Sequence, residues 1–166
     1  MRATHGVEIA NLCNYPQHLP TLAQWHFDQW SAYYPDQTLQ DFINDLQASL
    51  LGKRIPQTFI ALQNGQLAGS ASLLADDLDC RPELGPWLAS VFIHPDFRQQ
   101  GLATRLISAI EGHADQCEIN TLYLFTPDQQ AWYQRLGWKR HEDIALGGRR
   151  ISVMAKQRSQ RSSHST

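Results

Sequence analysis

The sequence has few cysteines, little net charge and no long apolar run, and each of these shortages excludes a class of protein. The cysteines are Cys13, Cys80 and Cys117, and their odd number and wide spacing fit neither a disulfide framework nor a zinc site. No stretch is apolar over the length of a membrane span, and the polar first residues do not resemble a signal peptide. The formal net charge of −2 argues against general nucleic-acid binding. We therefore expect a cytoplasmic protein that binds neither membranes nor nucleic acid.

The composition indicates one globular domain. Hydrophobic residues make up 42% of the sequence and charged residues 18%, which is typical of a folded chain rather than a disordered one. A length of 166 residues suits a single domain with a sizeable core, and we assign that domain to residues 1–155. Residues 156–166 contain Ser, Gln and Arg but no apolar residue, and we predict a disordered tail there.

Short apolar or alternating runs, separated by turn residues, predict the strands. The predicted strands are 7–12, 58–62, 66–75, 87–93, 121–126, 138–146 and 149–154. The pair Asn64–Gly65 predicts a tight hairpin between the second and third of them. The run 87–93 is nearly all apolar, as expected for a strand that is covered on both faces.

Helical periodicity predicts four helices. They cover 21–34, 39–51, the segment after Arg98, and 128–136. The predicted buried stripe of the first consists of Ala23, Phe27, Trp30 and Tyr34. Thr38, with Asp41 three residues later, predicts a capping box at the start of the second. Asp128 is the predicted cap of the last helix.

A phosphate-binding turn is predicted where the apolar run before Pro95 leads through a short polar loop into a helix. The first N–H groups of a helix have no partner within it, and the helix dipole adds positive character there. Gly101 lets the backbone approach an anion, Ala103 keeps the next turn narrow, and Arg98 adds a cation. One glycine does not make a dinucleotide fingerprint, no Gly-Lys-Ser/Thr follows for a nucleotide P-loop, and an ordinary turn remains an alternative.

Two segments resemble the motifs of the GNAT superfamily of N-acetyltransferases. Arg98-Gln99-Gln100-Gly101-Leu102-Ala103 is similar to the family's cofactor motif of Arg or Gln, two residues, Gly, one residue, then Gly or Ala. The segment from Asp128 to Trp138 resembles the family's helix with an aromatic pair and a closing Gly-aromatic step. The resemblance covers about residues 5–155. It implies an α/β (α+β) fold: a mixed, mostly antiparallel central sheet of about six to seven strands, flanked by about four helices and splayed near the central strand.

The resemblance implies acetyl-CoA as co-substrate and no metal. The backbone of Val91, Phe92 and Ile93 would pair with the pantetheine arm like an added strand, with the Phe92 N–H as donor to the thioester carbonyl. Arg98 and the amides of the turn would hold the diphosphate. The implied cofactor-binding residues of the turn are Gln99, Gln100, Gly101, Leu102, Ala103 and Thr104.

Two positions depart from the family's pattern. Gln99 stands where a glycine is usual, so we expect a stiffer loop. Asp128 stands where asparagine is frequent, and we expect this cofactor-binding position to contribute less to cofactor affinity and more to capping its helix.

The resemblance also implies catalytic roles. Tyr133 matches the tyrosine that serves as general acid in many GNAT enzymes, and a phenol with its ordinary pKa near 10 stays protonated at neutral pH. Glu83, just before the central strand, is the predicted base acting through water, and His94 is a weaker candidate. Because the first two helices help to shape the acceptor pocket in this family, Trp25, Tyr33 and Tyr34 are predicted to bind the acceptor and His26 is a further candidate for the pocket lining, with core packing of these rings as the alternative.

The predicted function is transfer of an acetyl group from acetyl-CoA to a primary amine by direct attack, with a small molecule or a peptide as acceptor. A protein N-terminus, a lysine, a polyamine, an aminoglycoside-like amine and an amino acid all stay open, although the acidic stretch 76–83 could attract a cationic amine. The alternatives are a non-catalytic acyl-CoA-binding sensor or partner module and transfer of a longer acyl group. Pairing into a homodimer also stays open.

Overall fold

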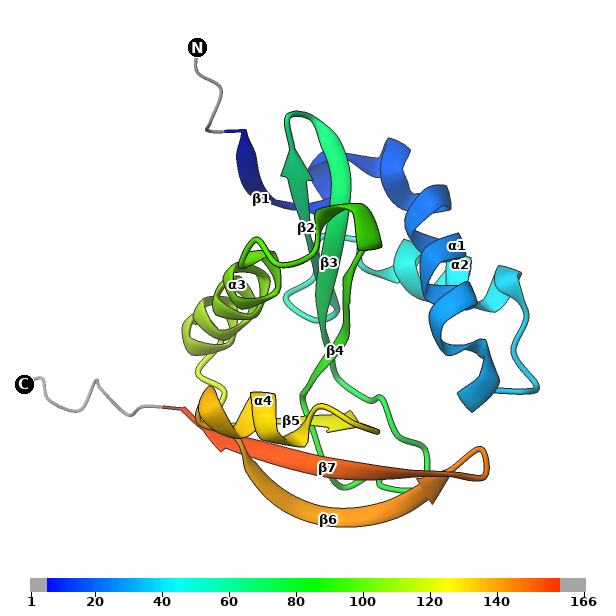
Figure 1. The fold of residues 1–166 in the computed structure, drawn as a ribbon, viewed down its shortest axis with the longest axis vertical. Helices are drawn as coiled ribbons and strands as arrows, with labels where there is room; N and C mark the ends of the chain where they lie inside the picture. The colour runs from blue at the N-terminus through cyan, green and yellow to red at the C-terminus, as the bar shows by residue number, and fades with distance from the viewer. Residues whose placement is uncertain (1–5, 159–166) are drawn as a thin grey trace, which may run out of the picture.

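The computed structural model describes residues 6–158, and within this range seven strands form one sheet in the order β1-β2-β3-β4-β5-β7-β6 (Figure 1). The strands are β1 (Val7–Asn11), β2 (Gln57–Gln63), β3 (Gln66–Leu74), β4 (Trp87–Ile93), β5 (Thr121–Thr126), β6 (Lys139–Leu146) and β7 (Arg149–Gln157). The α-helices are α1 (Leu19–Trp30), α2 (Leu39–Ala48), α3 (Leu102–Gln116) and α4 (Gln130–Arg135). Short 3-10 turns are η2 (Leu12–Asn14), η3 (Pro16–His18), η4 (Ser31–Tyr33) and η5 (Pro95–Phe97).

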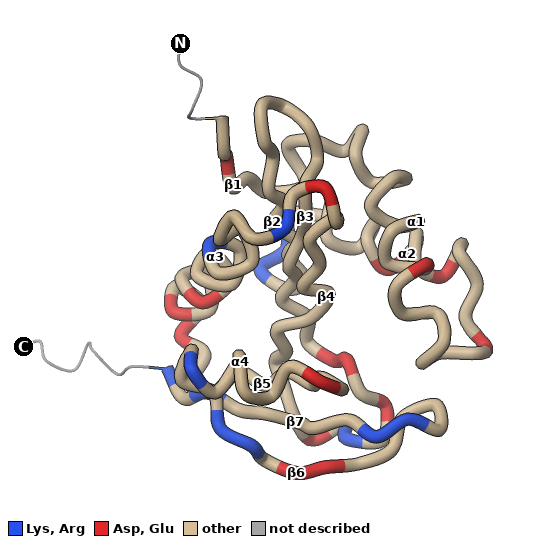
Figure 2. The backbone as a smooth tube through the Cα atoms, viewed as in Figure 1, with Lys and Arg blue, Asp and Glu red and all other residues tan. Residues whose placement is uncertain are grey.

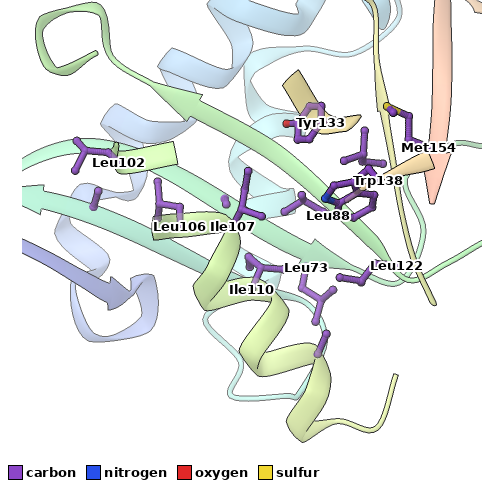
Figure 3. Packing of buried hydrophobic residues seen from close by; sticks show 14 of the residues in the cluster. Leu73, Leu88, Leu102, Leu106, Ile107, Ile110, Leu122, Tyr133, Trp138 and Met154 are labelled. Carbon is purple, nitrogen blue, oxygen red and sulfur yellow. The ribbon is translucent and has the colours of Figure 1, made fainter. Parts of the chain in front are cut away.

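Helices cover both faces of the sheet, because successive strand residues point to opposite sides. On β2, Ile60 packs into the cluster with the buried leucines of α1 and α2, whereas Ala61 packs into the cluster with α3. Figure 1 shows α3 on one side of β2–β4 and the α1–α2 pair on the other. The α3 residues Leu102, Leu106 and Ile110 lie in the main core with β3 and β4 (Figure 3). The N-terminus of α3 is thereby held against the end of β4.

The sheet opens beside β4. All neighbouring strands are antiparallel except β4 and β5, which run parallel and are in register at Trp87 and Tyr123 alone among the described residues. Beyond that pair the two strands diverge, so one edge of β4 lacks a neighbouring strand. This confirms the predicted splaying near the central strand.

A bulge distorts β4 at the same place. Ser70 of β3 pairs with Phe92 and Ser72 pairs with Ala89, so two steps along β3 correspond to three along β4. Within the bulge, Ser90 has a φ of +55°, a left-handed conformation that costs an L-residue about 1–2 kcal/mol. A bulge re-aims the backbone groups that follow it, and bulges are frequent near active sites.

The mixed, mostly antiparallel sheet with four α-helices in the described range confirms the predicted fold class. The spans of β4 and β5 agree with the sequence prediction, and the capping box of Thr38 and Asp41 is present on α2. No helix within residues 6–158 has the length and apolar character needed to cross a membrane.

Two predictions of local structure were wrong: the buried stripe of α1 and the cap of α4. The buried residues of α1 are Leu19, Leu22, Ala23 and His26. Phe27 and Tyr34 instead contact the Phe42 ring of α2, because α1 packs on that helix as well as on the sheet. Gln129, not Asp128, caps α4, and its N–H donates to the Thr126 hydroxyl at 3.1 Å.

The predicted tail begins too early. Strand β7 continues through Gln157, and the Lys156 ammonium donates to Glu111 of α3 at 3.0 Å and to the Leu136 carbonyl at 2.8 Å. Strand β7 can therefore include the charged residue Lys156, because Glu111 of α3 pairs with its ammonium group. Residues 159–166 of the predicted tail lie outside the described residues.

Candidate active site

A cavity of about 500 Å³ lies between the open edge of β4, the turn after it and the start of α4. Ten of the residues predicted for cofactor binding or catalysis line it: Val91, Phe92, Ile93, Arg98, Gln99, Gly101, Leu102, Ala103, Thr104 and Tyr133. The two motifs, separated by about 30 positions, thus meet at one cavity. Four further residues, which sequence reasoning missed, complete the lining: Gln29, Phe97, Gln129 and Trp132.

The β4 backbone offers donors to this cavity in a different register from the predicted one. The His94 N–H donates to the Ala68 carbonyl of β3 at 2.8 Å, and successive N–H groups of a strand alternate between its two edges. The Phe92 N–H therefore faces β3, whereas those of Val91 and Ile93 face the open edge. The predicted carbonyl donor, Phe92, does not fit this geometry, and the donor nearest the bulge on the open edge is Val91.

The turn after β4 presents a row of main-chain groups at the start of α3. Gly101 caps this helix with a φ of +76°, and no heavy atom lies within 4 Å of the position that a Cβ would occupy. The Arg98 guanidinium donates through Nε to the Ile93 carbonyl at 2.9 Å, which holds this cation at the mouth of the cavity. Open space, exposed amides and a fixed cation together suit an anion such as a diphosphate.

Gln99 adopts a φ of +65°, so it occupies the left-handed conformation for which the family's glycine is suited. We expect Gln99→Gly to leave the free energy of unfolding unchanged or to raise it by up to about 1 kcal/mol, because relief of left-handed strain outweighs the added freedom of the unfolded chain. Gln100→Gly, at a neighbouring position without positive φ, is expected to lower it by about 0.5–1 kcal/mol. Urea denaturation of both variants checks this, and equal destabilisation would contradict it.

Tyr133 stands at the far wall of the cavity with a buried ring. Its ring contacts Trp132 and Trp138 at centroid distances of 4.9 and 6.2 Å, and Figure 3 shows the hydroxyl pointing away from Trp138 and Met154. Within residues 6–158 no hydrogen-bond partner of this hydroxyl is found. Burial raises its pKa to about 12, so the phenol is protonated and available as a donor at neutral pH.

A second, larger cavity of about 1250 Å³ adjoins the first. The two share the lining residues Gln29, Val91, Arg98, Gln129 and Tyr133. Tyr33 and Tyr34, which are predicted to bind the acceptor, line the larger cavity together with Trp30 and Phe42. Tyr133 therefore stands where the two cavities meet.

The larger cavity carries an excess of carboxylates. Asp45 of α2 and Asp76, Asp77 and Asp79 of the segment between β3 and β4 line it, and Figure 2 shows acidic positions in that segment. None of these four forms an ion pair within the part of the chain that the structure describes. Burial and the charges of Asp45 and Asp79 raise the pKa of Asp77 well above its usual range. A bound cation would favour the ionised form of Asp77 and so oppose both the burial and the repulsion.

Several predicted site residues lie elsewhere. Glu83 is exposed in the segment before β4 and lines neither cavity, so the structure does not bring this candidate base together with Tyr133. Trp25 also lines neither cavity, because its ring packs on His94 and Phe92 at centroid distances of 4.7 and 5.7 Å. His94, the weaker candidate base, caps η5 by accepting from the Asp96 N–H at 3.1 Å. Gln100 is exposed outside both linings, and Asp128 lines the larger cavity instead of the smaller.

Comparisons with known proteins agree with this geometry. Residues 19–138 match the profile of the Acetyltransferase (GNAT) family. An acetyltransferase from Streptococcus agalactiae is 23% identical, with a TM-score of 0.68 and coverage of 92% of this chain and 98% of that one. The ribosomal-protein-S18-alanine N-acetyltransferase from Escherichia coli is 22% identical, with a TM-score of 0.64 and coverage of 93% and 95%.

A third similar structure contains a ligand. It is a ribosomal L7/L12 alpha-N-protein acetyltransferase in complex with coenzyme A, 14% identical, with a TM-score of 0.65 and coverage of 94% of this chain and 96% of that one. At these identities the solved structures show a shared fold. Among curated protein sequences, none matches the chain.

Proposed function

Because the chain belongs to the Acetyltransferase (GNAT) family, we propose that it transfers the acetyl group of acetyl-CoA to a primary amine of a cationic acceptor. One observation carries the proposal: Tyr133 lines both cavities. A donor held in the smaller cavity and an acceptor held in the larger would therefore meet beside its hydroxyl. The similar structure that contains coenzyme A supports the choice of donor.

The smaller cavity suits acetyl-CoA on the properties of the chain itself. The open edge of β4 offers the N–H groups of Val91 and Ile93 to an extended arm, as a neighbouring strand would. The turn from Arg98 to Thr104 offers main-chain amides and a guanidinium to a diphosphate. Gly101 leaves space for that group, because a Cβ there would meet no heavy atom within 4 Å.

The bound coenzyme supplies an acetyl thioester, and the protein supplies two donors for its reaction. The amine nitrogen forms a bond to the acetyl carbon while the carbon–sulfur bond breaks. The Val91 N–H donates to the carbonyl oxygen, where negative charge develops. The Tyr133 hydroxyl donates to the departing sulfur. The nitrogen loses one proton and the sulfur gains one, which balances the reaction.

The pKa of Tyr133 defines what this hydroxyl does. With its pKa raised to about 12, complete proton transfer to a thiolate of pKa about 8.5 is uphill by roughly 5 kcal/mol. The stabilisation therefore comes from a hydrogen bond to the sulfur. The proton that the sulfur gains overall is therefore the one that the amine nitrogen loses, because a nitrogen bonded to the acetyl carbon is a far stronger acid than this phenol.

Thiol release tests the proposed function. Acetyl-CoA and a panel of primary amines are incubated with the protein, and free thiol is measured against an amine-free blank. We expect amine-dependent release. Coenzyme A binding without release for any amine would instead identify a non-catalytic acyl-CoA-binding module.

The acidic lining of the larger cavity supports an acceptor with a second cationic group. A carboxylate is expected to strengthen binding of a protonated amine nearby, and the rings of Tyr33, Tyr34 and Phe42 offer contact to its alkyl part. We expect 1,5-diaminopentane to have a KM about tenfold or more below that of pentylamine. Because the pKa of Asp77 is raised, its charge is lost as the pH falls, so the preference for the diamine should grow with rising pH until the second ammonium group loses its proton at about pH 10.

Asp77→Asn isolates this charge. At a pH high enough to ionise Asp77, we expect the KM for 1,5-diaminopentane to rise about tenfold and the KM for pentylamine to change less than twofold. Asp36→Asn serves as the control, since Asp36 is exposed and outside both linings. Steady-state kinetics of the two variants decide the matter, and equal effects on both amines would contradict the assignment.

A further inference from the structure

His26 is a buried histidine that the function proposed above leaves without a role. It lies on α1 with 4% of its surface exposed, and its ring packs edge-on against Phe92 of β4 at a centroid distance of 6.4 Å. Burial lowers its pKa to about 3, so the imidazole is neutral at physiological pH. A neutral buried imidazole needs a hydrogen-bond partner, and here that partner belongs to the sheet.

The partner is the hydroxyl of Ser70 on β3. His26 Nε2 lies 2.8 Å from Ser70 Oγ, and Ser70 Oγ donates to the Ser90 carbonyl at 3.0 Å. A serine hydroxyl has one hydrogen, and a carbonyl can only accept. The Ser70 hydrogen is therefore directed to Ser90, and the proton between His26 and Ser70 must come from His26. This fixes the imidazole as the Nε2–H tautomer.

This series of hydrogen bonds ends at the peptide group between Ser90 and Val91. In a trans peptide the C=O and the N–H belong to one plane and point in opposite directions. The Ser70 hydroxyl that holds the Ser90 carbonyl therefore also sets the direction of the Val91 N–H. Ser90 is the bulged residue with a φ of +55°, so its conformation depends on such a contact.

We infer that His26 is a positioning residue, which acts through Ser70 to aim the Val91 N–H at the acetyl carbonyl oxygen. The inference rests on the proposed acetyl transfer. We call the hydrogen bonds from His26 through Ser70 to the Ser90 carbonyl the relay. A hydrogen bond to the carbonyl of an amide also polarises the amide, so the relay makes the Val91 N–H a stronger donor. It further connects α1, which lines the acceptor cavity through His26 itself, Gln29 and Trp30, to the backbone at the reacting centre.

Removal of the relay should slow turnover without weakening substrate binding. We expect His26→Leu and Ser70→Ala each to lower kcat about tenfold to a hundredfold, which is somewhat less than the loss of an entire oxyanion donor. The KM for the amine and the Kd for coenzyme A should stay within about threefold. His26→Gln should keep kcat within about threefold of the wild type, because its amide N–H can replace Nε2.

Ser49→Ala is the matched control. Ser49 is as buried as Ser70 and its hydroxyl also donates to a carbonyl, that of Leu46 at 2.7 Å, but it lies at the end of α2 outside both cavity linings. The Ser49→Ala variant should have a lower free energy of unfolding than the wild type and an unchanged kcat. The double variant of His26→Leu and Ser70→Ala should be no slower than either single one, because both act on one donor. The inference would be overturned if the loss of kcat in the double variant equalled the product of the two single losses, or if Ser49→Ala lost as much kcat as Ser70→Ala.

A spectroscopic measurement keeps the inference testable apart from turnover. In the ¹⁵N-labelled protein, the Val91 amide proton should shift downfield when acetyl-CoA is added to the wild type and to His26→Gln, and the shift should shrink in Ser70→Ala. The wild-type His26 ring should show the nitrogen signals of the Nε2–H tautomer. An unchanged Val91 shift in Ser70→Ala, or the other tautomer, rejects the relay even if the amine panel yields product. Absence of product with the expected shifts rejects only the acetyl transfer.

Discussion

Tyr133→Phe is expected to lower kcat by about a hundredfold while the Kd for coenzyme A changes less than twofold. The substitution removes one oxygen from a buried ring and leaves its contacts with Trp132 and Trp138 in place. The lost hydrogen bond acts only on the departing sulfur, so the effect falls on turnover and not on binding. Thiol-release kinetics and calorimetry with coenzyme A measure the two quantities separately.

Tyr123→Phe is the matched control for that result. Tyr123 lies on β5 with its ring 5.7 Å from that of Trp87, and it lines neither cavity, so its kcat should equal that of the wild type. Burial keeps the Tyr133 pKa at about 12. The wild-type kcat/KM should therefore rise as the acceptor amine loses its proton, with no decline from the phenol below about pH 10. Full turnover in Tyr133→Phe would remove this residue from the mechanism.

Gly101→Asp is expected to weaken coenzyme A binding about a hundredfold, whereas Gly101→Asn should weaken it less than tenfold. Asparagine and aspartate tolerate the left-handed conformation that Gly101 adopts, so both variants keep the turn. They differ in one negative charge. At about 5 Å from a diphosphate charge and an effective dielectric constant of about 20, that charge costs roughly 3 kcal/mol.

Two controls accompany the comparison of Gly101→Asp with Gly101→Asn. Gly52 has a φ of +77° with the same open space around a Cβ, but it is exposed after α2 and lines neither cavity. Gly52→Asp should therefore leave the Kd for coenzyme A unchanged. Pantetheine lacks the diphosphate and should bind both Gly101 variants equally. If Gly101→Asp and Gly101→Asn weaken coenzyme A to the same extent, the turn does not hold the diphosphate.

Local patterns were sufficient to predict most of the fold. The apolar run of β4 and the Thr38 capping box depend on residues close in sequence, and the structure confirms both. The buried face of α1 was missed because Phe27 and Tyr34 pack on Phe42 of α2, a contact that no periodicity within one helix can reveal. The end of β7 was missed because Glu111 of α3, far away in sequence, pairs with Lys156.

The residues of the candidate site also fall into those that local sequence motifs predict and those that depend on contacts between distant segments. That the turn residues and Tyr133 meet at one cavity was predictable because two short motifs contain them, and Gln129 and Trp132 could have been added as sequence neighbours of Tyr133. The proposed change of donor from Phe92 to Val91 was not predictable, because it depends on which edge of β4 faces β3 after the bulge. The link from His26 to Ser90 joins three separate elements, and sequence spacing contains no information on it.

The central claim is that the turn after β4 holds the diphosphate of acetyl-CoA through main-chain amides, beside the Tyr133 hydroxyl. Titration calorimetry of the wild-type protein with coenzyme A and with pantetheine tests it most directly. We expect a saturable heat with coenzyme A and binding at least a hundredfold weaker with pantetheine. No heat from coenzyme A at millimolar concentration, or equal affinity for the two compounds, would contradict the claim.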